Sequence, residues 1–221
     1  AEKAMDQLTH SVDYTAFHNG TISGLLKVMD QAGIETSVVQ SIATRPEQAE
    51  KILSWSIKIR SPRIEPFISL HPENTDEDRE RILRQARENG IKGVKIHPHY
   101  QGVNADDESM FPLYEAFLKH GFIVFFHSGQ DLAFPRCDNA TVKRMKNVLT
   151  RFPGMKTILA HFGAYREWDM VLEELAGLDV YFETSFMLEE AGEALFLKIL
   201  KKHSADRVMF GTDSPWTDPV N

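Results

Sequence analysis

Short apolar runs alternate with longer amphipathic stretches along the whole chain. The runs are rich in β-branched and aromatic residues and predict β-strands at 36–42, 63–70, 93–98, 122–129, 156–163, 179–185 and 207–215. The amphipathic stretches have helical spacing and predict α-helices at 24–33, 46–59, 75–90, 111–121, 140–152, 167–177 and 189–203. Strands that alternate with helical crossovers of this length are parallel, which predicts an α/β fold.

Helix-end signals support the predicted boundaries. Thr75 is a suitable N-cap and is followed by acidic residues, which are favourable in a first helical turn. Pro46 is compatible with a helix start, and Gly33 and Gly90 are natural helix ends. These residues agree with the periodicity on where the helices begin and end.

The spacing of the predicted strand ends favours a closed barrel. The predicted strands end near Ser41, Leu70, His97, His127, His161, Thr184 and Asp213. The gaps between successive ends are about 23 to 34 residues, close to the roughly 31 residues per unit of an eightfold barrel. An open doubly wound sheet is the alternative, but the sequence has neither G-x-G-x-x-G nor a P-loop. We therefore expect a TIM (β/α)8 barrel.

Both ends of the chain depart from a complete barrel. The sequence opens on AEKAMDQL, which has helical character, and the first predicted strand begins only at residue 36. It stops at GTDSPWTDPVN, where a closing helix would be expected. We expect one barrel domain over residues 1–221 that lacks its first strand and last helix.

Composition narrows the classes of partner. A formal charge of −7 argues against a nucleic-acid partner, since such binding needs a basic face. No apolar run approaches the roughly 18 residues that span a bilayer, and the single cysteine, Cys137, permits no internal disulfide. We expect a cytoplasmic protein that acts on a small molecule, without a nucleic-acid or membrane partner; a homodimer remains open.

Three ionisable residues stand directly after apolar runs and just before turn-forming residues. They are His127 in FIVFFHSG, His161 in KTILAHFG and Asp213 in RVMFGTDSP. The carboxyl ends of barrel strands meet at one face, so these side chains are expected to converge there. Neutral imidazole and carboxylate are ligands for zinc and similar divalent ions. A single histidine after a strand is more often structural, and this is the favoured interpretation of His71, His97 and His99 taken singly.

The motifs GVKIHP, FFHSG, LAHFG, YFETS and RVMFGTDSPW, in this order, resemble the amidohydrolase-2 family of metal-dependent TIM-barrel hydrolases. That family includes the aminocarboxymuconate semialdehyde decarboxylase type. The resemblance implies that His127 and Asp213 are metal ligands and that Asp213 also transfers a proton. It implies that His161 is a further ligand or a base. The family's first-strand H-x-H pair has no counterpart before Gly20.

Other polar residues near the predicted mouth have alternative interpretations. Lys95, in a K-x-H pattern with His97, is expected to face the substrate or balance charge, and a carbamylated lysine bridging two metals is the alternative. Arg136 and Arg166 follow strands and are candidates to bind a substrate carboxylate, although solvated arginines fit as well. For Glu183, pairing with an arginine or capping of a turn is favoured over metal ligation.

The residues and the resemblance together predict one divalent metal ion, with zinc expected and manganese, iron and nickel left open. The predicted reaction is hydrolysis of a C–N or C–O bond in a small amide, cyclic amide, lactone or ester, with water activated by the metal. A non-oxidative decarboxylase of an aromatic or unsaturated acid is the first alternative. A catalytically silent binding protein is the second, if the H-x-H pair is truly absent.

Overall fold

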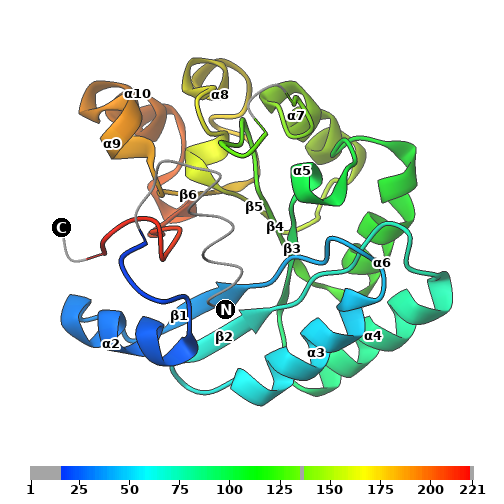
Figure 1. Ribbon diagram of the computed structural model, residues 1–221. Coiled ribbons are helices and arrows are strands. Elements are labelled where there is room, and N and C mark those ends of the chain that lie inside the picture. The colour runs from blue at the N-terminus through cyan, green and yellow to red at the C-terminus, as the bar shows by residue number, and fades with distance from the viewer. Residues whose placement is uncertain (1–15, 135–136, 220–221) are drawn as a thin grey trace.

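Parallel strands surrounded by helices form the protein, as a computed structural model that describes residues 16–134 and 137–219 shows (Figure 1). The strands are β1 (Ser37–Gln40), β2 (Ile64–Phe67), β3 (Gly93–Ile96), β4 (Ile123–Phe126), β5 (Thr157–Leu159), β6 (Tyr181–Glu183) and β7 (Val208–Met209). All lie within the predicted segments, which confirms the strand assignments.

The strands follow one another in chain order around the barrel wall. β1 pairs with β2, and β3 to β7 form a continuous parallel sheet. Ile68 joins the two groups, because its N–H donates to Gly93 O at 3.1 Å and its carbonyl accepts from Lys95 N at 2.7 Å. A doubly wound sheet would reverse its strand order part-way. The unbroken order confirms the barrel architecture over the open sheet.

Helices form the outer ring of the barrel (Figure 1). The longer ones are α2 (Ile22–Ala32), α3 (Gln48–Ile59), α4 (Asp76–Glu88), α6 (Phe111–His120), α7 (Val142–Arg151), α8 (Trp168–Glu174) and α10 (Glu193–Lys202). Shorter turns are α5 (Pro98–Gln101), α9 (Met187–Ala191), η1 (Glu108–Met110), η2 (His161–Gly163) and η3 (Ala205–Arg207). Each long helix coincides with a predicted one within a few residues.

Two local differences from the predicted helices have clear causes. The single helix expected at 189–203 is wrong, because Gly192 adopts φ 80° and ψ 164° and separates α9 from α10. The short α5 was not predicted; it begins with Pro98, whose fixed φ suits a first helical position, and Gly102, with φ 68°, caps its carboxyl end. The expected cap of α4 is present, since Thr75 Oγ1 accepts from Asp78 N at 3.1 Å.

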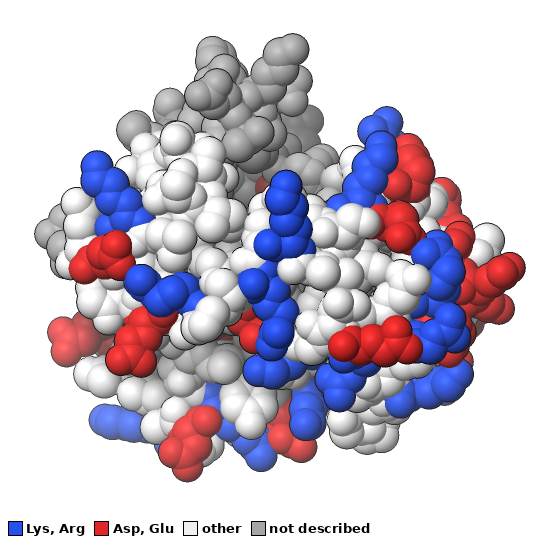
Figure 2. Space-filling model, turned by 90° about the horizontal axis from the view of Figure 1, so that it is seen from below, with Lys and Arg blue, Asp and Glu red and all other residues white. Residues whose placement is uncertain are grey.

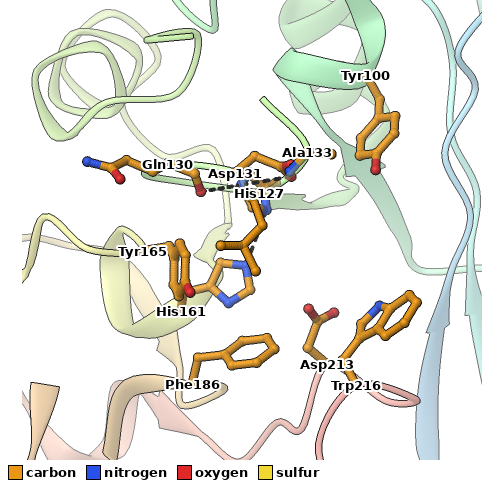
Figure 3. A pocket seen from close by; sticks show the side chains of 11 residues that line it. Tyr100, His127, Gln130, Asp131, Ala133, His161, Tyr165, Phe186, Asp213 and Trp216 are labelled. Carbon is orange, nitrogen blue, oxygen red and sulfur yellow. Dashed lines mark hydrogen bonds and ion pairs between the residues drawn. The ribbon is translucent and has the colours of Figure 1, made fainter. Parts of the chain in front are cut away.

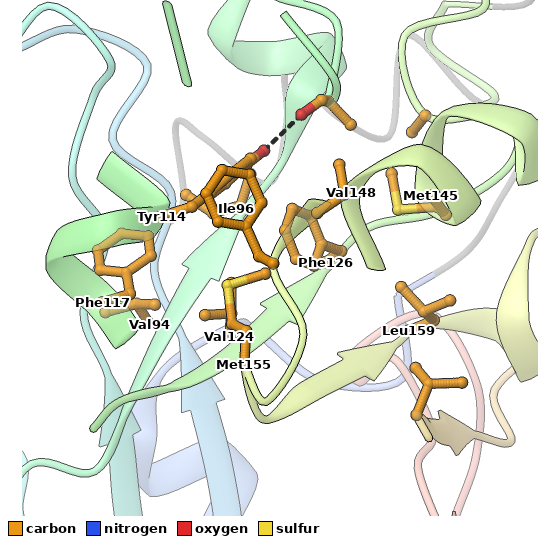
Figure 4. Close-up of a cluster of buried hydrophobic side chains, with 14 of the residues drawn as sticks. Val94, Ile96, Tyr114, Phe117, Val124, Phe126, Met145, Val148, Met155 and Leu159 are labelled. Carbon is orange, nitrogen blue, oxygen red and sulfur yellow. Dashed lines mark hydrogen bonds between the residues drawn. The ribbon is translucent and has the colours of Figure 1, made fainter. Parts of the chain in front are cut away.

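The main hydrophobic core lies between the strands and the helix ring. Phe126 on β4 meets Tyr114 of α6, with ring centroids 5.6 Å apart, and both side chains are fully buried (Figure 4). This cluster runs continuously from Ala49 on α3 to Ile199 on α10. A smaller cluster, made of Phe67, Phe125, Ile158 and Ala160, packs separately from it.

Among the described residues the barrel wall is open between β1 and β7, each of which pairs with one neighbour only. Side chains beside this opening are exposed, with Val38 at 48%, Met209 at 43% and Phe210 at 71%. At the carboxyl ends of the strands, Phe17 N donates to Pro215 O at 2.8 Å, so the first and last described segments lie side by side.

The surface carries charges of both signs. On the face shown in Figure 2, lysines and arginines lie among acidic side chains. No helix among the described residues is both long enough and apolar enough to cross a membrane.

Candidate metal centre and pocket

The three predicted site residues line one pocket. His127 follows β4, His161 begins η2 after β5, and Asp213 follows β7. Their side chains face a cavity of about 100 Å³ at the carboxyl ends of the strands (Figure 3). His161 Nε2 lies 3.2 Å from His127 Nδ1, so the two imidazoles are in direct contact. The expected convergence of these groups on one face is therefore present.

The backbone is unusual at two of these residues. His161 has φ 56° and Asp213 has φ 47°, both in the left-handed region that residues other than glycine rarely adopt. Sparsely populated backbone conformations of this kind gather at functional sites, where the surrounding structure holds them. In both cases the chain turns sharply as it leaves a strand, and the side chain is directed into the pocket.

A second set of candidate ligands lies around Nε2 of His127, the ring nitrogen that does not contact His161. The rings of His97 and His127 are stacked, with centroids 4.1 Å apart and planes at 9°. Asp131 Oδ2 lies 3.4 Å from His97 Nε2 and 3.6 Å from His127 Nε2, and Gln130 O lies 3.0 Å from the latter atom. Ligand atoms of His97, His127 and Asp131 all fall within 4.8 Å of one another. These residues could hold a metal ion.

The protonation states suit metal binding. Burial holds the pKa of His97 and of His127 well below the usual value. Burial, assisted by the positive charge of Lys95, lowers the pKa of His161 to about 3. All three imidazoles are therefore neutral at physiological pH, which is the form that coordinates a metal. Two neutral imidazoles with one carboxylate form a donor set typical of zinc and related ions.

The carboxylate and the lysine of the site influence each other. Burial raises the pKa of Asp213, and Lys95 opposes this rise. Burial lowers the pKa of Lys95 to about 8, against the attraction of Asp213, Glu183 and Asp131. Its Nζ lies 4.6 Å from the centre of the Phe125 ring. Lys95 is therefore placed to balance negative charge from inside the barrel.

The match to a known family model decides the family. The model described as amidohydrolase matches residues 19–220, almost the whole chain. The chain belongs to the amidohydrolase family. No curated protein matches its sequence.

Solved structures share the fold of this chain. 5-Carboxyvanillate decarboxylase from Sphingomonas paucimobilis has a TM-score of 0.72 and 16% identity, over 92% of this chain and 76% of that one. An uncharacterised TIM-barrel protein from Bordetella bronchiseptica has a TM-score of 0.70 and 20% identity, over 90% of this chain and 72% of that one. A 5-carboxyvanillate decarboxylase from Novosphingobium aromaticivorans, solved with bound manganese, has a TM-score of 0.67 and 15% identity, over 88% of this chain and 71% of that one. At these identities the likeness establishes the fold.

Glu183 belongs to the buried part of the candidate site. Its carboxylate accepts hydrogen bonds from Ser185 N at 2.7 Å, Ser185 Oγ at 2.8 Å and His161 N at 3.3 Å. It thus caps the turn after β6, as one of the two favoured interpretations predicted, and it has no arginine partner among residues 16–134 and 137–219. Burial raises its pKa to about 7, although the bonds from Ser185 lower it.

None of the described residues that were predicted to bind substrate lines the pocket. Lys95 and His97 are buried, and neither lines the cavity. Arg166 Nε lies 2.8 Å from Glu190 Oε2, and its guanidinium stacks over Tyr165. Arg136 lies outside the described residues. Roles for these four residues in substrate binding remain predictions.

Sequence reasoning missed Asp131 and Ser185. Asp131 follows His127 by four residues, in HSGQDL, and its relation to His97 depends on two loops meeting. Ser185 has no distinctive motif beyond its place after a predicted strand. A polar residue in the turn after each strand was the only signal that could have indicated either.

Proposed function

We propose that this amidohydrolase is a metal-dependent hydrolase that cleaves a C–N or C–O bond in a small amide, cyclic amide, lactone or ester. The observation that carries the proposal is the convergence of His127, His161 and Asp213 on one small pocket at the carboxyl ends of the strands. In barrels of this type, residues at that face perform the chemistry. The family membership supports the same class of reaction.

Two ligand sets for one divalent ion share His127. The first adds Asp213 and His161, as the family resemblance implies, and the second adds His97 and Asp131, whose ligand atoms lie close to His127 Nε2. A divalent ion at either place supplies Lewis acidity, which polarises a carbonyl group and makes water a better nucleophile at neutral pH. Zinc is the expected ion.

Asp213 and His161 would move the protons. Burial raises the pKa of Asp213, although Lys95 opposes the rise, and a carboxylate with a raised pKa is a stronger proton acceptor. His161 is neutral and directs Nε2 towards His127, within the same pocket wall. The aromatic side chains of Tyr100, Phe186 and Trp216 line the remaining surface and would keep the reacting group away from bulk water.

Metal content tests the ligand assignment. We expect His127→Ala to lower the affinity for zinc by at least about tenfold, since both ligand sets need this residue. If Asp213→Asn loses metal and Asp131→Asn keeps it, the ion belongs to the first ligand set. If Asp131→Asn loses metal and Asp213→Asn keeps it, the ion belongs to the second set. His120→Ala is the control, because His120 pairs with Glu80 away from the pocket. Full metal content in His127→Ala, measured by mass spectrometry after dialysis, would contradict the proposal.

A second candidate function is non-oxidative decarboxylation of an aromatic or unsaturated acid. The aromatic lining of the pocket favours a flat substrate, and two of the structures that share the fold are decarboxylases of aromatic acids. Products distinguish the reactions. Hydrolysis incorporates heavy oxygen from labelled water, whereas decarboxylation releases labelled carbon dioxide from the substrate carboxylate. We would test a panel of esters, lactams and benzoates with the metal-loaded protein. If neither product formed, a binding role would be favoured instead.

A further inference from the structure

The hydroxyl group of Tyr100 is a hydrogen-bond donor that the pocket leaves without an acceptor. Tyr100 lies on the short helix α5, after β3, and its side chain lines the cavity. Its hydroxyl points into the open space of the pocket (Figure 3). Among residues 16–134 and 137–219 this hydroxyl makes no hydrogen bond. Its hydrogen is therefore available to a molecule that enters the pocket.

Packing holds the ring of Tyr100 in place. The ring meets that of His97 edge to face, with centroids 4.6 Å apart, and that of Phe134 in the same manner at 5.0 Å. His97 is itself buried, so it forms a firm support. The fold thus fixes the position of the hydroxyl oxygen before any molecule binds, which lowers the entropic cost of a hydrogen bond to that molecule.

Other polar side chains of the pocket already have partners. The Tyr165 hydroxyl donates to Glu190. His161 has a partner at each ring nitrogen, Ser185 Oγ at 2.9 Å and His127 Nδ1 at 3.2 Å. These groups would have to break an existing hydrogen bond before they could bind another molecule, whereas Tyr100 would not.

The remaining polar groups of the lining do not replace Tyr100 as a donor. The second ring nitrogen of His127 lies 3.0 Å from Gln130 O. The Gln130 side chain extends away from the imidazoles, and the Trp216 indole stands beside Asp213 (Figure 3). The Asp213 carboxylate offers oxygens that accept hydrogen bonds in the ionised form. Tyr100 is therefore the donor best placed for an oxygen atom that lies in the open part of the pocket.

We propose that Tyr100 binds the substrate by donating a hydrogen bond to the carbonyl oxygen of the bond that is cleaved. This inference rests on the proposed function, in which water attacks the carbon of that carbonyl. The attack moves the π electrons of the carbonyl onto its oxygen, and a donor already in position stabilises the negative charge that develops there. Tyr100 thereby contributes to binding of the carbonyl group and to its reaction.

Two small probes test this hydrogen bond in protein from which metal has been removed, so that an ion does not compete for the carbonyl oxygen. Cyclopentanone has the carbonyl and the ring size of a small lactone, and methylenecyclopentane has a methylene group in place of the oxygen. Tyr100→Phe keeps the packed ring and removes the hydroxyl. We expect it to weaken cyclopentanone binding about fivefold and to leave methylenecyclopentane binding unchanged. Nuclear magnetic resonance titration measures both affinities through the indole signal of Trp216, which lines the pocket and is assigned with Trp216→Phe.

The vibration of the bound carbonyl gives a second readout, which a purely structural role would not change. A donated hydrogen bond weakens the C=O bond, so the stretching frequency of bound, isotope-labelled cyclopentanone should rise in Tyr100→Phe. Tyr181→Phe is the matched control and should leave both measurements unchanged, since Tyr181 lies on β6, is 36% exposed and does not line the pocket.

Three results would overturn the proposal. The first is that cyclopentanone does not bind to the wild type. The second is that its affinity and its C=O frequency are the same in the wild type and in Tyr100→Phe. The third is an equal loss of affinity for both probes in Tyr100→Phe, which would indicate that Tyr100 acts through packing.

The proposed function and the role of Tyr100 fail separately. If cyclopentanone binding depends on the Tyr100 hydroxyl but the metal-loaded protein hydrolyses no ester, amide or lactone, the proposed function fails and the hydrogen bond to a carbonyl ligand stands. If hydrolysis occurs while neither probe measurement responds to Tyr100→Phe, the proposed function stands and the role of Tyr100 fails.

Discussion

Lys95 is a lysine enclosed by the barrel with three carboxylates near it. Burial lowers its pKa from 10.5 to about 8. Unfolding restores the ordinary value, so between these two values the unfolded chain binds more protons than the folded one, and stability rises with pH. A pKa shift of this size corresponds to a loss of about 3 kcal/mol in the free energy of unfolding at neutral pH. Most of this loss is regained by about pH 10, where the lysine is neutral in the folded protein.

We therefore expect the unfolding free energy of the wild type to rise relative to that of Lys95→Met by about 2–3 kcal/mol between about pH 7 and about pH 10. Urea unfolding at the two pH values measures the difference. Lys119→Met, at a surface lysine paired with Glu80, is the control and should show no such change. A constant difference between wild type and Lys95→Met would show that Lys95 is solvated like a surface lysine.

At the scale of single elements, helix α4 illustrates how a local signal contributes to stability. Thr75 Oγ1 accepts from Asp78 N, and three acidic residues occupy the first turn. Thr75→Ala removes this cap and should lower the free energy of unfolding by about 1 kcal/mol. Thr150→Ala is the matched control, since Thr150 is an exposed helical residue that bonds to Lys146 O four residues earlier. Thermal or urea unfolding of both variants measures the contrast, and equal losses would contradict the capping role.

At the scale of the whole molecule, the continuous core predicts a single cooperative unit. The main cluster extends from α3 to α10, so damage at one point should affect all of it. Phe117 on α6 is fully buried, whereas its neighbour Leu118 is 41% exposed. Phe117→Ala should cost about 3–5 kcal/mol and Leu118→Ala much less. Circular dichroism and tryptophan fluorescence should report the same shifted midpoint. Separate midpoints would indicate that the β1–β2 pair unfolds independently of β3–β7.

The architecture was predictable because the relevant signals are local. Apolar runs of strand length and amphipathic stretches each depend on neighbouring residues, and their alternation determines the parallel topology. The break at Gly192 was not predictable in the same way, since a glycine inside an amphipathic stretch is also tolerated in a helix.

The candidate site was predictable only in part. His127, His161 and Asp213 could be found because strand ends share one face of a barrel. Asp131 and Ser185 could not, because their partners come from loops whose conformation depends on packing between distant segments.

The left-handed backbone at His161 and Asp213 has a practical consequence for mutagenesis. Alanine at either position would remove the functional group and also place an unsuited residue in a strained turn, so one measurement would mix two effects. Asparagine tolerates this conformation better than most residues and keeps the shape of an aspartate side chain. Asp213→Asn is therefore the replacement that separates the contribution of the negative charge from the integrity of the turn.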